Sequence, residues 1–186
     1  MDNSEWKKRI KMERGQKDTF FSIHPGSPVP MEEGALFEGL KYCPPDPGYR
    51  FELKLFEHLE KRKVTMAYTK GDEQEFVGSG EFRFQIGEKK LVLQAYKRSD
   101  QEDNLFVPFK DATCGKETYG AGRYLDLDYD RDRTPDGKWV VDFNRAYNPW
   151  CAYSEQYTCP FVQPENWLEV QIRAGEKDYS REALSI

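Results

Sequence analysis

From residue 49 onward, the apolar residues of this chain recur with a period of two, and this pattern restricts its fold more than any other feature. Apolar and polar side chains alternate in residues 50–55, 64–68 and 81–86. Because successive side chains of a β-strand point to opposite faces of a sheet, each segment predicts a strand with one buried face. Turn sequences such as Lys70-Gly71-Asp72 separate the segments. The pattern therefore predicts a mainly β fold, either an antiparallel barrel or a strongly curved sandwich.

The rest of the chain adds a helix and a connector to this β body. Asn3 or Ser4 can cap a helix over residues 3–20, and prolines concentrate in residues 24–48, which predicts a connector that cannot contain a central strand. A length of 186 residues suits a single domain spanning 1–186, with its β body at 49–175 and a long C-terminal loop. Aromatic residues make up 15% of the chain, which indicates a folded domain despite a charged fraction of 33%.

Charge and hydropathy exclude several classes of partner. A net charge of −5 argues against binding to nucleic acid or to anionic membranes. No apolar run approaches the roughly 20 residues that cross a bilayer. The first 17 residues are charged throughout and contain no apolar signal core, so a cytoplasmic location is expected. The sequence leaves the oligomeric state open.

The chain has four cysteines, and in a reducing compartment they are expected to stay free. The closest pair, Cys151 and Cys159, is too widely spaced for a zinc motif, and both histidines lie far upstream. Buried thiols are therefore favoured, and no metal site is predicted.

Two glycines interrupt one of the predicted strands. Phe76, Phe82 and Phe84 share a face with Gly78 and Gly80 when the alternation is continued through the segment. Glycines on an inward face indicate a bend or a close approach of another backbone.

Residues 142–159, followed directly by Pro160, form the segment richest in aromatic and polar side chains. Prolines break any regular element here, so we expect a rigid loop laid across a sheet, the kind of segment that often carries function. Asn144, Asn148 and Asn166 are expected to hold this region by hydrogen bonds to backbone groups outside any strand.

Residues 111–129 form a second such segment. Gly120 and Gly122 permit a close backbone approach, and Arg123 falls among the apolar residues of a predicted strand. A buried arginine must be paired because its charge cannot be removed by deprotonation. One interpretation is an ion pair with Asp111 or Asp142, and the other is a guanidinium that binds a carboxylate or phosphate of a ligand.

An acidic run beginning at Asp126 has the spacing of a calcium loop, but Arg131 and Gly137 occupy its sixth and twelfth positions, where glycine and glutamate are required. The sequence instead predicts carboxylates on the solvent face of a strand. The run comprises Asp126, Asp128, Asp130 and Asp132.

Four long segments support a resemblance to a known family. They are KYCPPDPGYRF, LFVPFKDATCGKETYGAGRYLDL, DFNRAYNPWCAYSEQYTCP and PENWLEVQIRAGEK. In the same order along most of the chain, they closely resemble a prokaryotic family known only as domain of unknown function sixteen-eighty-four. The chain differs at Phe161-Val162-Gln163, where the family is richer in proline. The resemblance implies a grouping but no activity, cofactor or catalytic residue.

Three classes of function remain open from the sequence. The first is a protein that binds a small polar or anionic ligand in a pocket of the β-barrel. The second is an enzyme in which Asp142 or Glu165 acts as acid or base and Cys151 as nucleophile, without a nearby histidine to serve as its base. The third is a structural or interaction module without a ligand. The ligand-binding candidates are Tyr119, Gly120, Gly122, Arg123, Tyr124, Asp142, Asn144, Tyr147 and Asn148.

Overall fold

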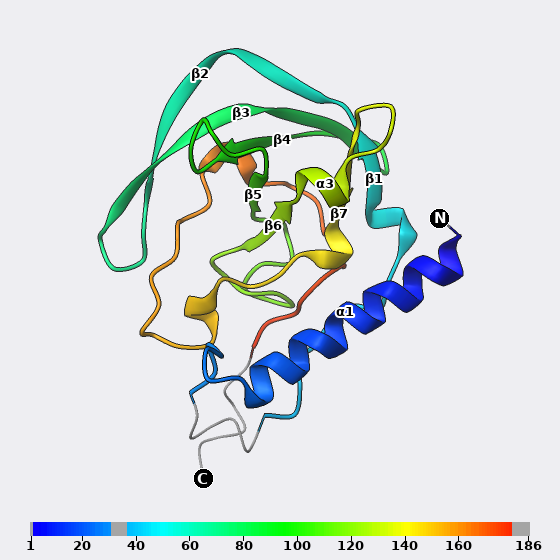
Figure 1. Cartoon of the computed structure of the whole chain (residues 1–186), viewed down its shortest axis with the longest axis vertical. Helices are drawn as coiled ribbons and strands as arrows, with labels where there is room; N and C mark the ends of the chain where they lie inside the picture. Colours follow the sequence, from blue (N-terminus) through cyan, green and yellow to red (C-terminus); the bar gives the residue numbers. More distant parts are fainter. Residues whose placement is uncertain (1, 31–36, 180–186) are drawn as a thin grey trace.

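The computed structural model describes residues 2–30 and 37–179. A long N-terminal helix, α1 (Asn3–Ile23), precedes a body of short and long strands (Figure 1). One short helix, α3 (Tyr129–Asp132), follows the sixth strand. The strands are β1 (Arg50–Leu53), β2 (Leu55–Ala67), β3 (Glu73–Ile86), β4 (Lys89–Lys97), β5 (Leu105–Phe109), β6 (Arg123–Leu127) and β7 (Trp139–Asp142).

The strands form two antiparallel sheets. One has the order β2-β3-β4-β5-β6, and the other is the pair β1-β7. The prediction of a mainly β, antiparallel fold with an N-terminal helix is confirmed. The larger sheet does not close on itself within the described residues, because β2 and β6 each have only one neighbouring strand. Of the two predicted alternatives, the strongly curved sandwich fits this arrangement and the closed barrel does not.

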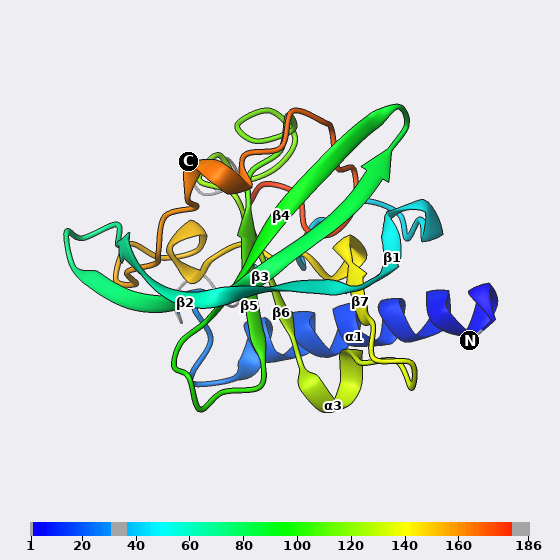
Figure 2. The same cartoon turned by 90° about the horizontal axis from the view of Figure 1, so that it is seen from above.

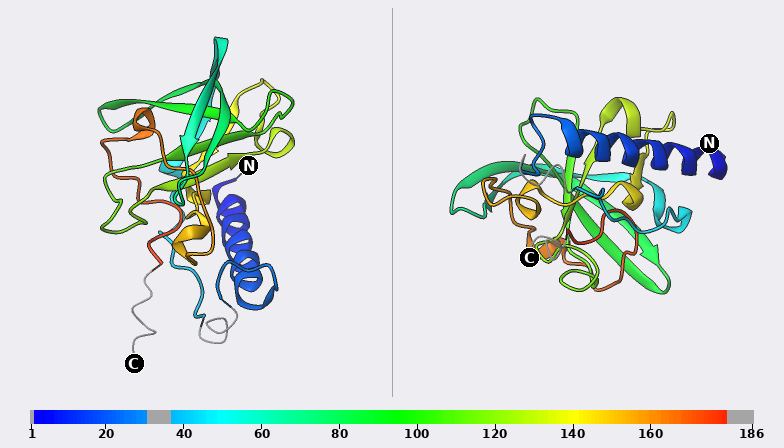
Figure 3. Two further views of the ribbon diagram at one scale, coloured as in Figure 1. Left: turned by 90° about the vertical axis from the view of Figure 1, so that its left-hand side faces the viewer. Right: turned by 90° about the horizontal axis from the view of Figure 1, so that it is seen from below.

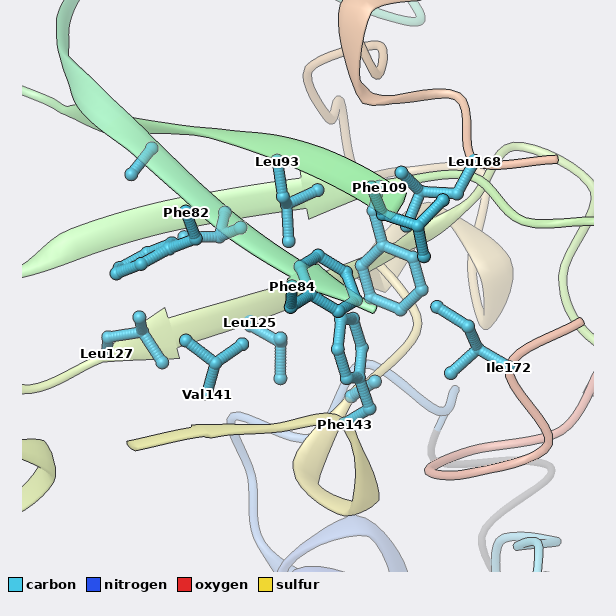
Figure 4. Close-up of a cluster of buried hydrophobic side chains, with 14 of the residues drawn as sticks. Phe82, Phe84, Leu93, Phe109, Leu125, Leu127, Val141, Phe143, Leu168 and Ile172 are labelled. Atoms are coloured by element: carbon cyan, nitrogen blue, oxygen red, sulfur yellow. The ribbon is translucent and has the colours of Figure 1, made fainter. Parts of the chain in front are cut away.

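The main core lies between the two sheets. Phenylalanine and leucine side chains from β3, β4, β5 and β6 pack against apolar side chains of β7 and of the segment after it (Figure 4). Phe143 stands at the centre, with its ring centroid 5.1 Å from that of Phe109 and 5.7 Å from that of Phe84. Such packing removes a large apolar area from water, at roughly 25 cal/mol per Å².

A bulge in β3 explains the two glycines of that strand. Gly78 pairs with Tyr96 and Gly80 with Ala95, so β3 contains one residue more than β4 at this point. A Cβ on Gly80 would lie 2.6 Å from the carbonyl oxygen of Phe56, which confirms the predicted close backbone approach. The extra residue also reverses the facing of the side chains before it. Phe76 therefore leaves the core that holds Phe82, and the prediction that they share a face was wrong.

The opposite face of the larger sheet carries a second apolar cluster that includes Phe76, Phe106 and Tyr124. The 142–159 loop lies across this face, as predicted. Tyr147 and Tyr124 exchange backbone hydrogen bonds of 2.9 and 3.1 Å, and Thr69 donates to the carbonyl of Cys159 at 3.1 Å. Figure 1 shows the loop in yellow to orange below the sheet.

Helix α1 runs along the outside of the β body (Figures 2 and 3). Trp6, Ile10 and Phe21 form its buried side. The indole of Trp6 donates to Asp142 at 2.7 Å, which joins the start of the helix to the end of β7. The helix begins at the predicted residue and extends three residues further. Its N-cap position is Asp2, and no side chain there forms a capping hydrogen bond, so the predicted capping by Asn3 or Ser4 was wrong. No helix in the described part of the chain is long and apolar enough to cross a membrane.

The three asparagines hold the irregular segments as predicted. The amide group of Asn144 accepts from the backbone N–H of Asp46 at 2.9 Å and donates to its carbonyl at 2.8 Å. Asn166 contacts Gln94 in the same two ways and also donates to Pro108. The C-terminal part of the chain is therefore fixed to the body without belonging to a sheet.

Candidate functional site

Arg123 is fully buried and paired inside the protein. Its guanidinium lies 3.1 Å from the carboxylate of Asp111 and donates to the carbonyls of Ile172, Ala174 and Glu176. It lines none of the three cavities described below. Of the two interpretations of this residue, the structure favours the ion pair.

The two glycines beside Arg123 shape the backbone around it. Gly122 has a φ of +101°, and a Cβ there would lie 2.7 Å from the carbonyl oxygen of Phe109. Gly120 lies against Gly115. Neither glycine lines one of the cavities described here.

A cavity of about 320 Å³ lies between α1 and the β body, and we call it the helix cavity. Asp142, Asn144 and Tyr147, three of the predicted ligand-binding residues, line it. Side chains of α1 such as Arg14 and Lys17 complete the lining, and they were not among the predicted site residues. They could not be identified because nothing in the helix indicates which strand it covers.

Most charges in the helix cavity neutralise one another. Lys17 pairs with Glu176, and Arg145 lies 2.8 Å from both Glu13 and Asp132. Asp130 and Asp132 lie in helix α3, and Asp132 is only 2% exposed. The prediction that the acidic run lies on the solvent face of a strand was therefore wrong for these two residues. The cavity therefore holds an internal ion network that leaves little net charge for a ligand.

Arg14 is the cation of the helix cavity that pairs with carbonyls instead of carboxylates. It donates to Cys43 at 2.8 Å and to Asn144 at 3.1 Å, and its guanidinium lies 4.4 Å from the centroid of the Tyr42 ring. Burial lowers the pKa of Arg14 and raises that of Tyr42. Arg14 thus joins the helix to the connector and to the end of β7.

A second cavity, of about 460 Å³, lies between the larger sheet and the 142–159 loop, and we call it the aromatic cavity. Three ring contacts extend across the sheet, with centroid distances of 5.5 Å for Phe76–Phe106, 4.9 Å for Phe106–Tyr124 and 5.9 Å for Tyr124–Tyr147. From the loop, Trp150 packs edge-on against Tyr157 at 5.0 Å. The aromatic residues that line this cavity are Tyr68, Phe76, Phe106, Tyr124, Tyr147, Trp150 and Tyr157.

Arg98, just after β4, supplies the positive charge of the aromatic cavity. Its guanidinium carbon lies 5.9 Å from the centroid of the Phe106 ring. Burial raises the pKa values of Tyr68 and Tyr147, and the charge of Arg98 acts on both hydroxyls in the opposite direction. Within the described residues, Arg98 has no carboxylate within 4.0 Å. No sequence pattern pointed to Arg98, because it follows a lysine in an ordinary charged turn.

Two thiols meet at the wall of the aromatic cavity. Cys159 lines the cavity, and its sulfur accepts a hydrogen bond from the backbone N–H of Cys151 at 3.4 Å. The Cys151 side chain is hydrogen-bonded to Cys159, and the hydroxyl of Tyr119 lies 3.8 Å from its sulfur. The hydrogen bond from Cys151 lowers the pKa of Cys159, while the same contact and burial raise the pKa of Cys151. Cys151 was the predicted nucleophile, but Cys159 is the thiol whose pKa is lowered.

The three predicted catalytic residues lie at different places. Asp142 lines the helix cavity, and Cys151 lies beside Cys159. Glu165 accepts from the hydroxyl of Tyr96 at 2.9 Å in a third cavity beside residues 57–62. Each side chain has its own partners, and no cavity described here is lined by two of them.

Asn148, the last of the predicted ligand-binding residues, is engaged with the C-terminal segment. Its backbone N–H donates to the carboxylate of Glu176 at 2.9 Å, and its side chain donates to the carbonyl of Lys177 at 2.8 Å. Two predicted residues, Tyr124 and Tyr147, line the aromatic cavity, and Tyr119 reaches its wall through Cys151.

Comparisons with known proteins place the chain in a family without an assigned activity. None of the curated proteins compared with the chain matches it significantly. The solution NMR structure of an uncharacterized protein from Haloarcula marismortui is 37% identical, with a TM-score of 0.72, over 95% of this chain and 96% of that one. Residues 35–177 match the family described as Protein of unknown function (DUF1684), to which this chain therefore belongs.

Proposed function

We propose that this protein binds a small ligand with a planar body and an anionic group in the aromatic cavity. The volume of about 460 Å³ lies within the usual range of small-molecule pockets, which is roughly 300–1,000 Å³. Aromatic faces such as those of Phe106 and Tyr124 favour flat ligands, because offset and edge-on ring contacts stabilise by about 0.5–1.5 kcal/mol beyond the buried area.

The observation that carries the proposal is the unpaired charge of Arg98. In the helix cavity, Lys17 and Arg145 are already neutralised by carboxylates of the protein, so an anion there would have to displace them. Arg98 faces no such competitor among the described residues, and its planar guanidinium can bind a carboxylate or phosphate through two parallel hydrogen bonds.

A titration with benzoate and its uncharged isostere benzamide tests this proposal. Backbone amide NMR shifts should concentrate on residues around Phe106 and Trp150, and benzoate should bind more tightly. Arg98 is exposed, so solvent screening limits its contribution to about 1 kcal/mol, which is about a five-fold difference in Kd.

The Arg98→Gln variant should remove the preference for benzoate. Arg133→Gln is the matched control, because Arg133 also lies over aromatic rings, 5.1 Å from Tyr129 and 5.4 Å from Trp139, but outside the aromatic cavity. Shifts scattered over the surface, or equal affinity for the two probes in the wild type, would refute the proposal.

A further inference from the structure

The two thiols at the aromatic cavity differ from the other cysteines of the chain in having each other as partners. Cys43 and Cys114 are held among polar groups of the body, and burial raises the pKa of each. Cys159 instead lines a cavity, and Cys151 is hydrogen-bonded to it from outside the cavity lining. Cys159 is buried apart from this cavity, and Cys151 is half-buried. A thiol that lines a cavity and lies beside a second thiol has the arrangement used for thiol–disulfide exchange.

We propose that Cys159 and Cys151 form a thiol–disulfide exchange site that reduces small disulfides bound in the aromatic cavity. The inference uses the cavity of the proposed function and assigns it a substrate class, namely low-molecular-weight disulfides that carry an anionic group. Cys159 would be the attacking thiol because it lines the cavity, and Cys151 the resolving thiol because it contacts Cys159 from the side of the loop.

The protein groups around Cys159 favour its thiolate. Backbone N–H groups of Cys151 and Trp150 donate to its sulfur, and the Cys151 thiol gives a further hydrogen bond. The other titratable groups that act on it are the tyrosines of the cavity and its wall, whose pKa values are raised by burial, so they stay protonated at neutral pH. They are Tyr68, Tyr119 and Tyr124.

The exchange proceeds in two balanced steps. The Cys159 thiolate attacks one sulfur of the substrate, which forms a mixed disulfide and releases the other half as a thiolate. Arg98 faces this leaving charge from the same cavity. Cys151 then transfers its proton to the released thiolate and attacks the sulfur of Cys159, which expels the second half. The substrate gains two electrons and the protein gains a disulfide. Two molecules of a low-molecular-weight thiol, which are oxidised to their own disulfide, return the protein to its dithiol form.

Incubation of the reduced full-length protein with glutathione disulfide provides the test. After the remaining thiols are blocked with N-ethylmaleimide, peptide mapping should find a disulfide between Cys151 and Cys159, and Cys43 and Cys114 should be blocked. The Cys151→Ser variant should retain one glutathionyl group on Cys159. Cys159→Ser should leave Cys151 unmodified. A wild-type protein without the predicted disulfide, or with glutathione on Cys151 first, would overturn the inference.

The pH dependence of alkylation gives a second readout that needs no variant. An ordinary thiol has a pKa of about 8.5. Because the pKa of Cys159 is lowered, its modification by iodoacetamide should have a midpoint at a lower pH than this. At pH 7 it should react at least about ten-fold faster than Cys114. Equal rates would show that the pair only fills space. Exchange without benzoate preference would refute the proposed function alone, and benzoate preference without exchange would refute this inference alone.

Discussion

The buried ion pair of Arg123 and Asp111 allows a quantitative test of whether Arg123 has a structural role. In Arg123→Met the side chain stays long and apolar, but the carboxylate of Asp111 loses its counter-ion at a site with no solvent exposure. Three carbonyls, those of Ile172, Ala174 and Glu176, also lose a donor. Removal of one partner of a buried pair costs about 3–5 kcal/mol, which corresponds to a fall in Tm of about 6–20 °C for a chain of this size.

Urea denaturation followed by tryptophan fluorescence measures this loss. The matched control is Arg173→Met, because Arg173 also pairs with a carboxylate, Glu117 at 2.8 Å, but its side chain is 55% exposed. That control should lose far less stability, because solvent screens an exposed ion pair. The double variant Arg123→Met/Asp111→Leu should lose less free energy of unfolding than the two single variants lose together, by about 2 kcal/mol or more. If Arg123→Met were as stable as Arg173→Met and lost benzoate binding, Arg123 would be a ligand residue and the structural argument would fail.

Two further stability predictions concern the irregular segments. Asn166→Ala removes three hydrogen bonds of a fully buried side chain and should cost about 3 kcal/mol by urea denaturation, whereas Asn104→Ala, which loses one exposed bond, should cost less than about 1 kcal/mol. Gly122→Ala should destabilise by about 2 kcal/mol or more, because its φ is positive and the new methyl group would meet the Phe109 carbonyl. Gly15→Ala, in an open position of α1, should stabilise by about 0.5–1 kcal/mol, and a loss of equal size at both glycines would contradict the reasoning.

Local sequence patterns predicted the elements of this fold better than their orientation. Alternation located the strands because side-chain facing is a property of each strand alone. It failed at Phe76 because a bulge shifts the alternation by one residue, and that shift depends on how Gly78 and Gly80 pair with β4. The glycines indicated a bend or a close backbone approach at this point. The pairing that reverses the facing of the side chains, however, involves a separate segment of the chain.

The candidate site was predicted in part for the same reason. The 142–159 loop and its tyrosines could be identified because their composition is unsuited to a regular element. Arg98 could not, since it becomes significant only where the end of β4 reaches the aromatic rings of β3 and β5. The difference between Cys151 and Cys159 also depends on which backbone N–H groups point at which sulfur, and this is a consequence of the folded loop.

The aromatic cavity has walls that the rest of the protein holds in place, and this bears on how tightly it can bind. On one side are the strands β3, β5 and β6, whose rings already pack against one another. On the other, the loop is tied to Tyr124 and to Thr69 by backbone hydrogen bonds. Ordering a side chain or loop on binding costs about 0.5–1.5 kcal/mol for each immobilised side chain, and a cavity formed in advance avoids most of that loss. A modest charge such as that of Arg98 can therefore decide which small ligand is bound, because little of its interaction energy is offset by ordering the site.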